Sequence, residues 1–202
     1  MSKLIGLVGG IAAGKTPITS ICASLGAHII NTDSLGHKSY EKYTPAYHKI
    51  INEFGTNILC SQDMIDRKKL GTIVFNDKKS LSKLNSIVWP CVKDFIKKDI
   101  ESHPNRIIII ESALLFESSI CDDLDEIWLV DIPREVQINR LLEYRGLNRE
   151  EALSRIFSQM TAQDMMRLGK NLYPNKTIIQ FDGNSSMIEL QKKCADHYKT
   201  FL

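Results

Sequence analysis

A glycine-rich segment near the N-terminus has the residue types and spacing of a phosphate-binding loop. The pattern G-x-x-x-x-G-K-S/T is matched by Gly9, Gly10, Ile11, Ala12, Ala13, Gly14, Lys15 and Thr16. Glycines let the backbone fold closely around a phosphate, and the N-terminus of the following helix adds positive potential. In this pattern Lys15 reaches the outer phosphates of a nucleotide and the Thr16 hydroxyl coordinates Mg²⁺. The alternative is a glycine-rich turn with a surface lysine, which the strand and helix predicted on either side disfavour.

Pro17 is unusual directly after such a loop. Proline is tolerated in a first helical turn, but it biases Thr16 away from helical angles and lacks an N–H that could donate to phosphate. A charge-assisted hydrogen bond contributes about 1.5 to 3 kcal/mol, so its loss weakens nucleotide binding about tenfold or more. We therefore expect reduced affinity rather than inactivity, with the ATP contacts running from Gly9 through Pro17.

Three carboxylates follow three predicted strands. Asp33 comes just after the second strand, Glu111 ends the third, and Asp131 lies near the end of the fourth. In a parallel sheet all three fall at the carboxyl edge beside the phosphate loop, where α/β sheets bind ligands. Phosphoryl transfer to a hydroxyl needs one carboxylate to take the proton and others to hold Mg²⁺ through water. Spacing alone leaves Asp33 equally suited to capping a helix over residues 34–40, and it leaves Glu111 open as a Mg²⁺ ligand through water; we expect Asp131 to be structural.

The elements that must position these residues indicate an α/β fold. Short apolar runs predict five strands at residues 3–8, 27–31, 106–110, 126–132 and 177–181. Several of these runs are continuously apolar, as in parallel strands that are buried on both faces. A helical repeat from Ile18 to Leu25 follows the loop and stops at Gly26. We expect a core built from residues 1–39, 104–133 and 167–202.

Two connections are longer than a parallel sheet requires. Roughly 70 residues separate the second and third strands, against a minimum crossover of about 12. Helical spacing there predicts an inserted helical subdomain at residues 40–103; the alternative is a set of helices that extend the cover of the main core. After the fourth strand, a break at Gly146 and a capping pair of Asn148 and Glu151 predict a helical hairpin, part of a lid at residues 134–166. Its polar face is either solvated or grips anions; it carries Arg134, Arg140, Arg145, Arg149 and Arg155.

Composition restricts the partners and the compartment. The 202 residues include 26 basic and 24 acidic side chains, a balance too even for binding along nucleic acid. The five cysteines form no C-x-x-C pair, so we expect neither a disulfide framework nor a zinc site. The histidines show no metal-ligand spacing. No apolar stretch approaches about 20 residues and no basic leader is present, so we expect a cytoplasmic protein without a signal peptide or membrane span.

Beyond the phosphate loop, a series of ordered motifs resembles the dephospho-coenzyme A kinase family. The motifs are GLVGGIAAGKT, INTDSLGHKSY, EFGTNIL, RKKLGTIVF, LNSIVWP, ESALLFE and DEIWLVDIP, then Gln137 with Arg140, and Arg155 with SQM. They cover about residues 3–165. In DSLGH and in Trp89-Pro90 the likeness is nearer to the kinase portion of the eukaryotic bifunctional coenzyme A synthase than to the bacterial enzyme.

The resemblance implies transfer of the ATP γ-phosphoryl group to the ribose 3′-hydroxyl of dephospho-coenzyme A, the last step of coenzyme A synthesis. It implies Asp33 as catalytic base, Lys15 and Arg140 as catalytic cations, and Mg²⁺ held by Thr16 and, through water, by Glu111. Asp33, Arg67 and Leu115 are the implied acceptor contacts. The implied fold is a nucleoside-monophosphate-kinase-like five-stranded parallel sheet with a helical coenzyme A subdomain and a lid. We expect a monomer whose partners are ATP and dephospho-coenzyme A.

The sequence is also compatible with two other functions. Pro17 and an altered C-terminal third suit a catalytically weak homologue that binds nucleotide or coenzyme A and serves as an interaction or regulatory subunit. A third interpretation keeps the phosphate loop and changes the acceptor to a nucleoside monophosphate or another small alcohol. An acceptor-dependent assay of ADP release distinguishes the three.

Overall fold

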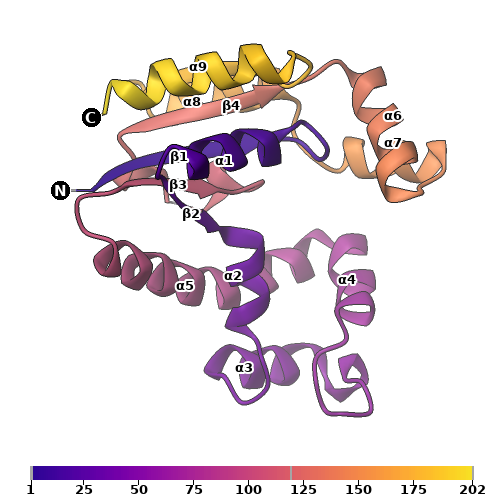
Figure 1. Ribbon diagram of the computed structural model, residues 1–202. Coiled ribbons are helices and arrows are strands. Elements are labelled where there is room, and N and C mark those ends of the chain that lie inside the picture. The colour runs from indigo at the N-terminus through magenta and orange to yellow at the C-terminus, as the bar shows by residue number, and fades with distance from the viewer. Residues whose placement is uncertain (1, 119, 202) are drawn as a thin grey trace. The chain divides into compact units, whose positions relative to one another are not determined.

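The computed structural model describes residues 2–118 and 120–201, apart from the side chains of Phe75, Glu117 and Cys121. It divides the chain into two compact units (Figure 1). We call Met1–Asn31 with His103–Leu202 the sheet unit, and Thr32–Ser102 the helical unit. The second unit therefore begins at Thr32, eight residues before the start expected from sequence at residue 40.

The sheet unit is built on the parallel sheet that the sequence predicts. Its five strands follow the order β2-β3-β1-β4-β5, and every neighbouring pair is parallel. The strands are β1 (Lys3–Gly9), β2 (His28–Asn31), β3 (Ile107–Glu111), β4 (Glu126–Asp131) and β5 (Thr177–Asp182). Each lies within two residues of its predicted bounds. Because β1 is central, the loop that follows it lies between the ends of β3 and β4.

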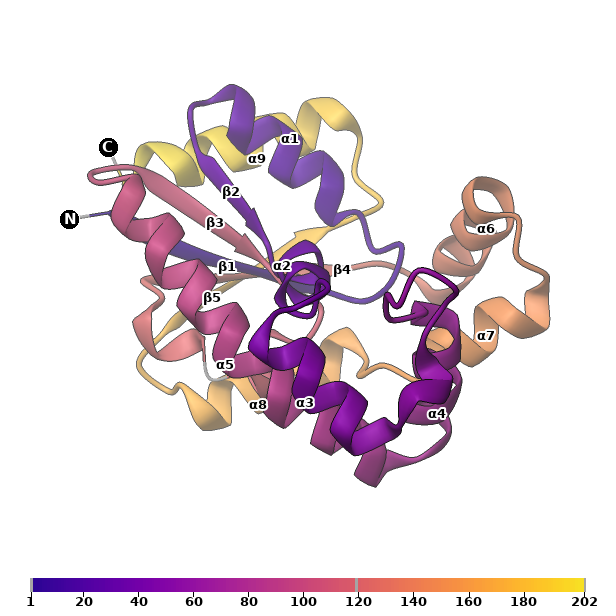
Figure 2. The ribbon, with the colours of Figure 1, turned by 90° about the horizontal axis from the view of Figure 1, so that it is seen from below.

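Helices cover both faces of this sheet, as the continuously apolar strands require. One face is covered by α1 (Lys15–Ser24) and α9 (Met187–Lys199) (Figure 2). These helices pack over Trp128 and Phe181, whose ring centroids lie 4.9 Å apart. On the other face lies α8 (Ala162–Leu172), where Gly169 approaches Phe116 and Ile178 so closely that a Cβ would meet each at 2.8 Å. Two short 3-10 turns, η2 (Leu115–Glu117) and η3 (Cys121–Asp123), join β3 to β4.

The predicted helical hairpin follows β4 as α6 (Arg134–Arg145) and α7 (Arg149–Phe157). Gly146 ends α6 in a left-handed conformation, with φ of 61°, which glycine adopts without a steric penalty. Asn148 and Glu151 form the predicted capping box at the start of α7. The hairpin has its own buried apolar cluster, made of Ile138, Leu141 and Ala152, and loop residues Ile11 and Ala12 pack against it.

The helical unit has a separate core. It contains α2 (Thr32–Ser39), α3 (Pro45–Phe54), η1 (Thr56–Ile58), α4 (Arg67–Asn76) and α5 (Lys78–Ser102). The fully or nearly fully buried side chains Ile50, Ile58, Leu70 and Val74 fill its interior. The long helix α5 continues through Pro90 without interruption.

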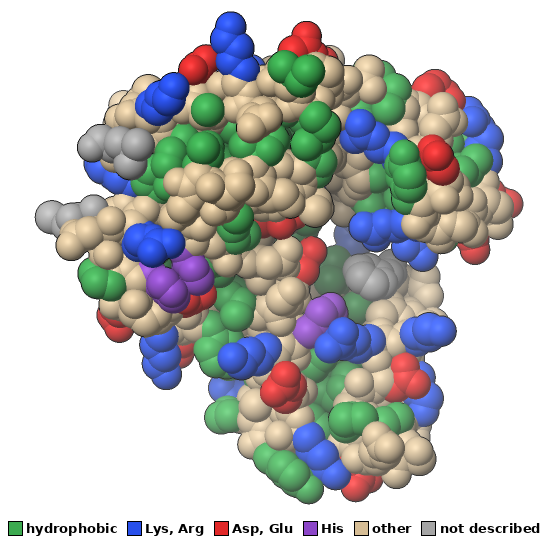
Figure 3. Space-filling model, in the orientation of Figure 1, with side chains coloured by type: hydrophobic (Ala, Val, Ile, Leu, Met, Phe, Trp, Pro, Cys, Tyr) green, Lys and Arg blue, Asp and Glu red, His purple; other side chains and the backbone are tan. Residues whose placement is uncertain are grey.

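Among the helices that the structure describes, none combines the length and the apolar character needed to cross a membrane. On the face drawn in Figure 3, lysine and arginine side chains are interspersed with aspartate and glutamate rather than merged into one basic surface.

Candidate functional site

The phosphate loop lies in the context that the sequence predicts, between the end of β1 at Gly9 and the start of α1 at Lys15. Two loop residues have positive φ angles, Ala12 at 56° and Gly14 at 106°. The Lys15 ammonium donates to the carbonyl oxygens of Gly9 at 2.8 Å and Gly10 at 3.2 Å. The lysine therefore lies folded over its own loop.

Pro17 is accommodated more easily than expected. It is the third residue of α1, and Thr16 is helical in spite of it, so the predicted bias of Thr16 away from the helix is wrong. Proline is compatible with the first helical turn because its fixed φ suits the helix and because the N–H groups of that turn have no intrahelical acceptor; the steric bias on Thr16 is too weak to prevent the helix from starting before it. Thr16 remains exposed at the helix start, where its hydroxyl is accessible to a ligand.

The parallel register brings Glu111 and Asp131 to the same edge of the sheet as the loop. Glu111 accepts a hydrogen bond from the Asn31 amide at 3.1 Å, across the ends of β2 and β3. Asp131 uses both carboxylate oxygens, one toward the backbone N–H of Ile132 at 2.8 Å and one toward the Gln180 amide at 3.0 Å. These bonds agree with the structural role expected for Asp131.

Arg140 extends from α6 to the phosphate loop. Its guanidinium donates to the Ala12 carbonyl at 3.2 Å and, more weakly, to the Ala13 carbonyl at 3.4 Å. It also donates to the Gly183 carbonyl at 2.8 Å. A Cβ on Gly183 would lie 1.9 Å from the Ala13 carbonyl oxygen, so only glycine fits where the loop after β5 meets the phosphate loop.

The other arginines of the hairpin make different contacts. Arg149 forms an ion pair with Glu135 at 3.0 Å, and the Arg134 guanidinium lies over the Phe157 ring, 5.0 Å from its centre. The arginines of this face therefore have different roles. Part of it forms surface contacts, while Arg140 joins the phosphate loop.

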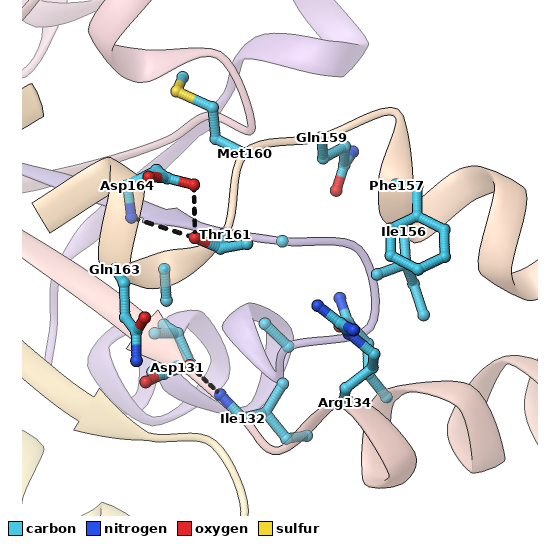
Figure 4. A pocket seen from close by; sticks show the side chains of 15 residues that line it. Asp131, Ile132, Arg134, Ile156, Phe157, Gln159, Met160, Thr161, Gln163 and Asp164 are labelled. Carbon is cyan, nitrogen blue, oxygen red and sulfur yellow. Dashed lines mark hydrogen bonds between the residues drawn. The ribbon is translucent and has the colours of Figure 1, made fainter.

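A pocket of about 440 Å³ opens beside the loop. Figure 4 shows Asp131, Thr161 and Gln163 along one side of this pocket and Arg134, Ile156 and Phe157 along the opposite side. Gly10 and Ala13 of the loop contribute to its wall. The pocket thus joins the phosphate loop, the end of β4 and the segment between α7 and α8, which is an arrangement able to hold a nucleotide.

Asp33 and Arg67 belong to the helical unit. The helix α2 begins at Thr32, so Asp33 lies in its first turn, and the alternative prediction that Asp33 caps a helix starting at residue 34 is wrong. Burial lowers the pKa of His37; the nearby Arg67 charge lowers it further, and the Asp33 charge opposes both. Tyr40 lies 2.6 Å from His37 Nδ1. Asp33 and Arg67 therefore act electrostatically on the same histidine.

Leu115 differs from the other predicted acceptor contacts because its side chain is fully buried. It packs beneath Gly6 of β1, where an added Cβ would lie 2.8 Å from a Leu115 methyl group. Such a side chain contributes packing rather than an exposed contact surface.

Three residues at the loop had no role in the sequence interpretation: Gly183, Gln137 and Gln159. Gln137 Nε2 donates to the Ile11 carbonyl, and Gln159 Oε1 accepts from the Ile11 N–H at 2.7 Å. Both glutamines occur in the motifs that resemble the kinase family. The resemblance therefore points to these residues, but it does not say what they do.

Known proteins resemble this chain along nearly all of its length. The Dephospho-CoA kinase family profile matches residues 3–180. The dephospho-CoA kinase of Carboxydothermus hydrogenoformans is 38% identical over 192 residues, which cover 94% of this chain and 93% of that protein. The solved structure of dephospho-CoA kinase from Campylobacter jejuni superposes with a TM-score of 0.67 at 26% identity, covering 98% of this chain and 96% of that one. A Thermus thermophilus structure shares the fold, with a TM-score of 0.82 at 23% identity over 100% of this chain and 98% of that one.

Proposed function

The chain belongs to the dephospho-CoA kinase family, and we propose that it acts through the phosphate loop and Arg140 of the sheet unit together with Asp33 and Arg67 of the helical unit. The reaction is the final step of coenzyme A biosynthesis, in which ATP phosphorylates the ribose 3′-hydroxyl of dephospho-coenzyme A and ADP is released. The observation that carries this function is the family match, which spans the phosphate loop, both helical segments and all the named residues.

Lys15 and Arg140 are the cations of the proposed phosphoryl transfer. In the structure both donate to backbone carbonyls of the phosphate loop. Hydrogen bonds from these cations to anionic phosphate oxygens are stronger than bonds to neutral carbonyls, so a nucleotide can replace the carbonyls as partner. Arg140 then stabilises the negative charge that develops on the transferred group, while Lys15 binds the outer phosphates.

Asp33 is the proposed base that orients the 3′-hydroxyl and accepts its proton. It is exposed and lies two residues after the end of β2 in the chain. Arg67 is the proposed partner for an anionic group of the acceptor, supported by its electrostatic proximity to the helix that carries Asp33.

Mg²⁺ fits the donor set that the sheet unit offers. Thr16 and Glu111 would hold it, Glu111 through water, because hydroxyl, carboxylate and water oxygens are the ligands this ion prefers. When bound, Mg²⁺ neutralises charge on the β- and γ-phosphates during transfer.

A coupled assay of ADP release tests this function. We expect Mg²⁺-dependent ADP release only when dephospho-coenzyme A is present. Lys15→Ala and Asp33→Asn should each lower kcat/KM by at least about 100-fold, as removal of a positioned acid–base or electrostatic group does. Lys3→Ala and Asp63→Asn are matched controls, because each removes an exposed ion-paired charge from the same unit as its counterpart.

Three results would contradict the proposal. Full activity in Lys15→Ala or Asp33→Asn would remove the assigned role. Coenzyme A binding in calorimetry without turnover at high protein concentration would instead favour a regulatory homologue, and turnover of another alcohol would change the acceptor.

We also propose that the enzyme acts as a monomer in the cytoplasm. Support for a reducing compartment comes from the sequence, in which the five cysteines are scattered and form no C-x-x-C pair. Light scattering of the purified protein tests the monomer, and a dimer at micromolar concentration would contradict it.

A further inference from the structure

Two glutamine side chains hold both backbone polar groups of Ile11, in the middle of the phosphate loop. Gln159 Oε1 accepts from the Ile11 N–H at 2.7 Å, and Gln137 Nε2 donates to the Ile11 carbonyl. Gln137 lies on α6, and Gln159 lies between α7 and α8, where Figure 4 shows it pointing into the pocket. The proposed chemistry uses neither residue. We call this pair of contacts the glutamine clamp.

The surroundings of the clamp are built to accommodate it. Gln137 is only 9% exposed, so its amide has little access to solvent and needs a protein partner. A Cβ on Gly10 would lie 3.0 Å from Gln137 Nε2 and 3.7 Å from Gln159 Oε1, so the glycine leaves room for both amides. The Ile11 side chain packs against the apolar cluster of the hairpin, so the same residue is fixed by packing and by hydrogen bonds.

The loop needs such support because part of it is strained. Ala12 follows Ile11 and has a φ of 56°, a left-handed conformation that costs a non-glycine residue about 1 to 2 kcal/mol. Strained backbone persists only where its surroundings fix it. A loop that is already held in its binding shape also spends less ordering entropy when it binds a ligand.

We propose that Gln137 and Gln159 are positioning residues, which hold the phosphate loop in its nucleotide-binding shape and connect it to the helical hairpin. The inference adds two positioning residues to the proposed active site, and it rests on the proposed function for the identity of the nucleotide. It assigns opposite hydrogen-bonding roles, donor and acceptor, to two chemically identical side chains. Gln137 must donate to Ile11, whereas Gln159 must accept from it, and the backbone fixes which end of each amide faces the loop.

This difference in polarity gives a test in which charge is matched. Gln159→Glu keeps an acceptor for the Ile11 N–H, but Gln137→Glu places a carboxylate against the Ile11 carbonyl. Gln137→Lys keeps a donor, but Gln159→Lys places an ammonium against the Ile11 N–H. Within each pair the added charge is the same and lies at the same loop. Gln137 is more buried than Gln159, so desolvation penalises the variant at 137 in both pairs, and only the hydrogen bonds predict that the order inverts between the glutamate pair and the lysine pair.

The measurements are ADP affinity by calorimetry with Mg²⁺, the KM for ATP, the KM for dephospho-coenzyme A and kcat. We expect Gln137→Glu to weaken ADP binding and raise the KM for ATP about tenfold more than Gln159→Glu does, which is the size of one lost or reversed hydrogen bond. The order should invert for the lysine pair. The KM for dephospho-coenzyme A should stay within about twofold, since a merely structural defect would alter both substrates.

Equal losses within each charge pair would overturn the inference, as would losses confined to the KM for dephospho-coenzyme A. If one glutamate variant fails to fold, which thermal unfolding reveals, the lysine pair decides the question. ADP binding separates this inference from the proposed function: wild-type protein that binds ADP without phosphorylating dephospho-coenzyme A contradicts only the function. Wild-type protein that binds no ADP contradicts both.

Discussion

At the scale of single residues, Ala12 is a point where stability and loop shape conflict. Its φ of 56° suits glycine, so we expect Ala12→Gly to stabilise the protein. Relief of a left-handed strain of about 1 to 2 kcal/mol offsets the entropic cost of a glycine, about 0.5 to 1 kcal/mol, and leaves a net gain of up to about 1.5 kcal/mol, reduced by the lost contact of the Ala12 methyl group with the hairpin cluster. Urea unfolding measures the gain.

The neighbouring Ala13 is the matched control for this substitution. It is buried and is not among the residues with positive φ, so Ala13→Gly should destabilise by about 1 kcal/mol through lost packing and added chain entropy. A loss of stability in Ala12→Gly as large as that in Ala13→Gly would show that the left-handed conformation stores no strain.

The carboxyl group of Glu126, the first residue of β4, should make the stability of the protein depend on pH. Burial raises the pKa of its carboxyl, although the hydrogen bond from Trp128 Nε1 and the charge of His197 act in the opposite direction. An acid with a raised pKa binds protons more tightly in the folded state than in the unfolded state. Stability therefore falls as the pH rises from the ordinary glutamate pKa through the raised one, and this loss persists at neutral pH.

Glu126→Gln removes this titration and keeps an oxygen that accepts from Trp128. We expect the variant to match the wild type in acid and to be more stable above the raised pKa, in urea titrations at a series of pH values. Asp125→Asn, a change at the adjacent and more exposed carboxylate, is the control. A variant that is less stable than the wild type at neutral pH would mean that the charge of Glu126 stabilises the fold.

At the scale of elements, the structure offers two equivalent helix caps with different neighbours. Asn148 and Glu151 form a capping box on α7 in the hairpin, and Ser186 and Glu189 form another on α9. Replacement of either cap residue by alanine should cost about 1 kcal/mol. Only Asn148→Ala should also raise the KM for ATP, because α7 packs through its apolar cluster on Ile11. An equal rise in KM in Ser186→Ala would show that the kinetic effect follows stability alone.

The strands and the hairpin could be predicted from sequence because their determinants are local. The apolar runs of the strands and the Asn148–Glu151 capping pair are visible within a few residues. The start of α2 at Thr32 was missed because no distinctive cap precedes it, and α8 and α9 were not predicted although Thr161 and Ser186 supply N-caps. For α8 and α9, the sequence indicates the helix start only through a single cap residue, and no long apolar repeat marks the helix itself.

The contacts at the loop could not be predicted, because they join residues that are distant in sequence. Gln159 and Ile11 are 148 positions apart, and Gln137 and Ile11 are 126 apart. The motif identified the loop and the resemblance identified both glutamines, but only the fold brings them together. The same reason explains Leu115, whose place in a motif gave no indication that its side chain is buried beneath Gly6.

At the scale of the whole molecule, the proposed catalytic residues are divided between the two compact units. Lys15 belongs to the sheet unit and Asp33 to the helical unit, and the chain passes between the units after Asn31 and after Ser102. If both residues act on one phosphoryl transfer, the substrates must contact both units during the reaction. Residues that serve one step are energetically coupled, whereas independent residues contribute additively to the activation free energy.

A double-mutant cycle on kcat/KM measures this coupling. We expect the Lys15→Ala and Asp33→Asn double variant to lose far less activity than the product of the two single losses, because either change alone already disables the shared step. Lys15→Ala combined with Asp63→Asn should instead give simple multiplication, since Asp63 lies in the same unit as Asp33 but has no proposed role. A multiplicative loss for Lys15 with Asp33 would mean that the two residues act independently, and the base for the 3′-hydroxyl would have to be sought elsewhere in the chain.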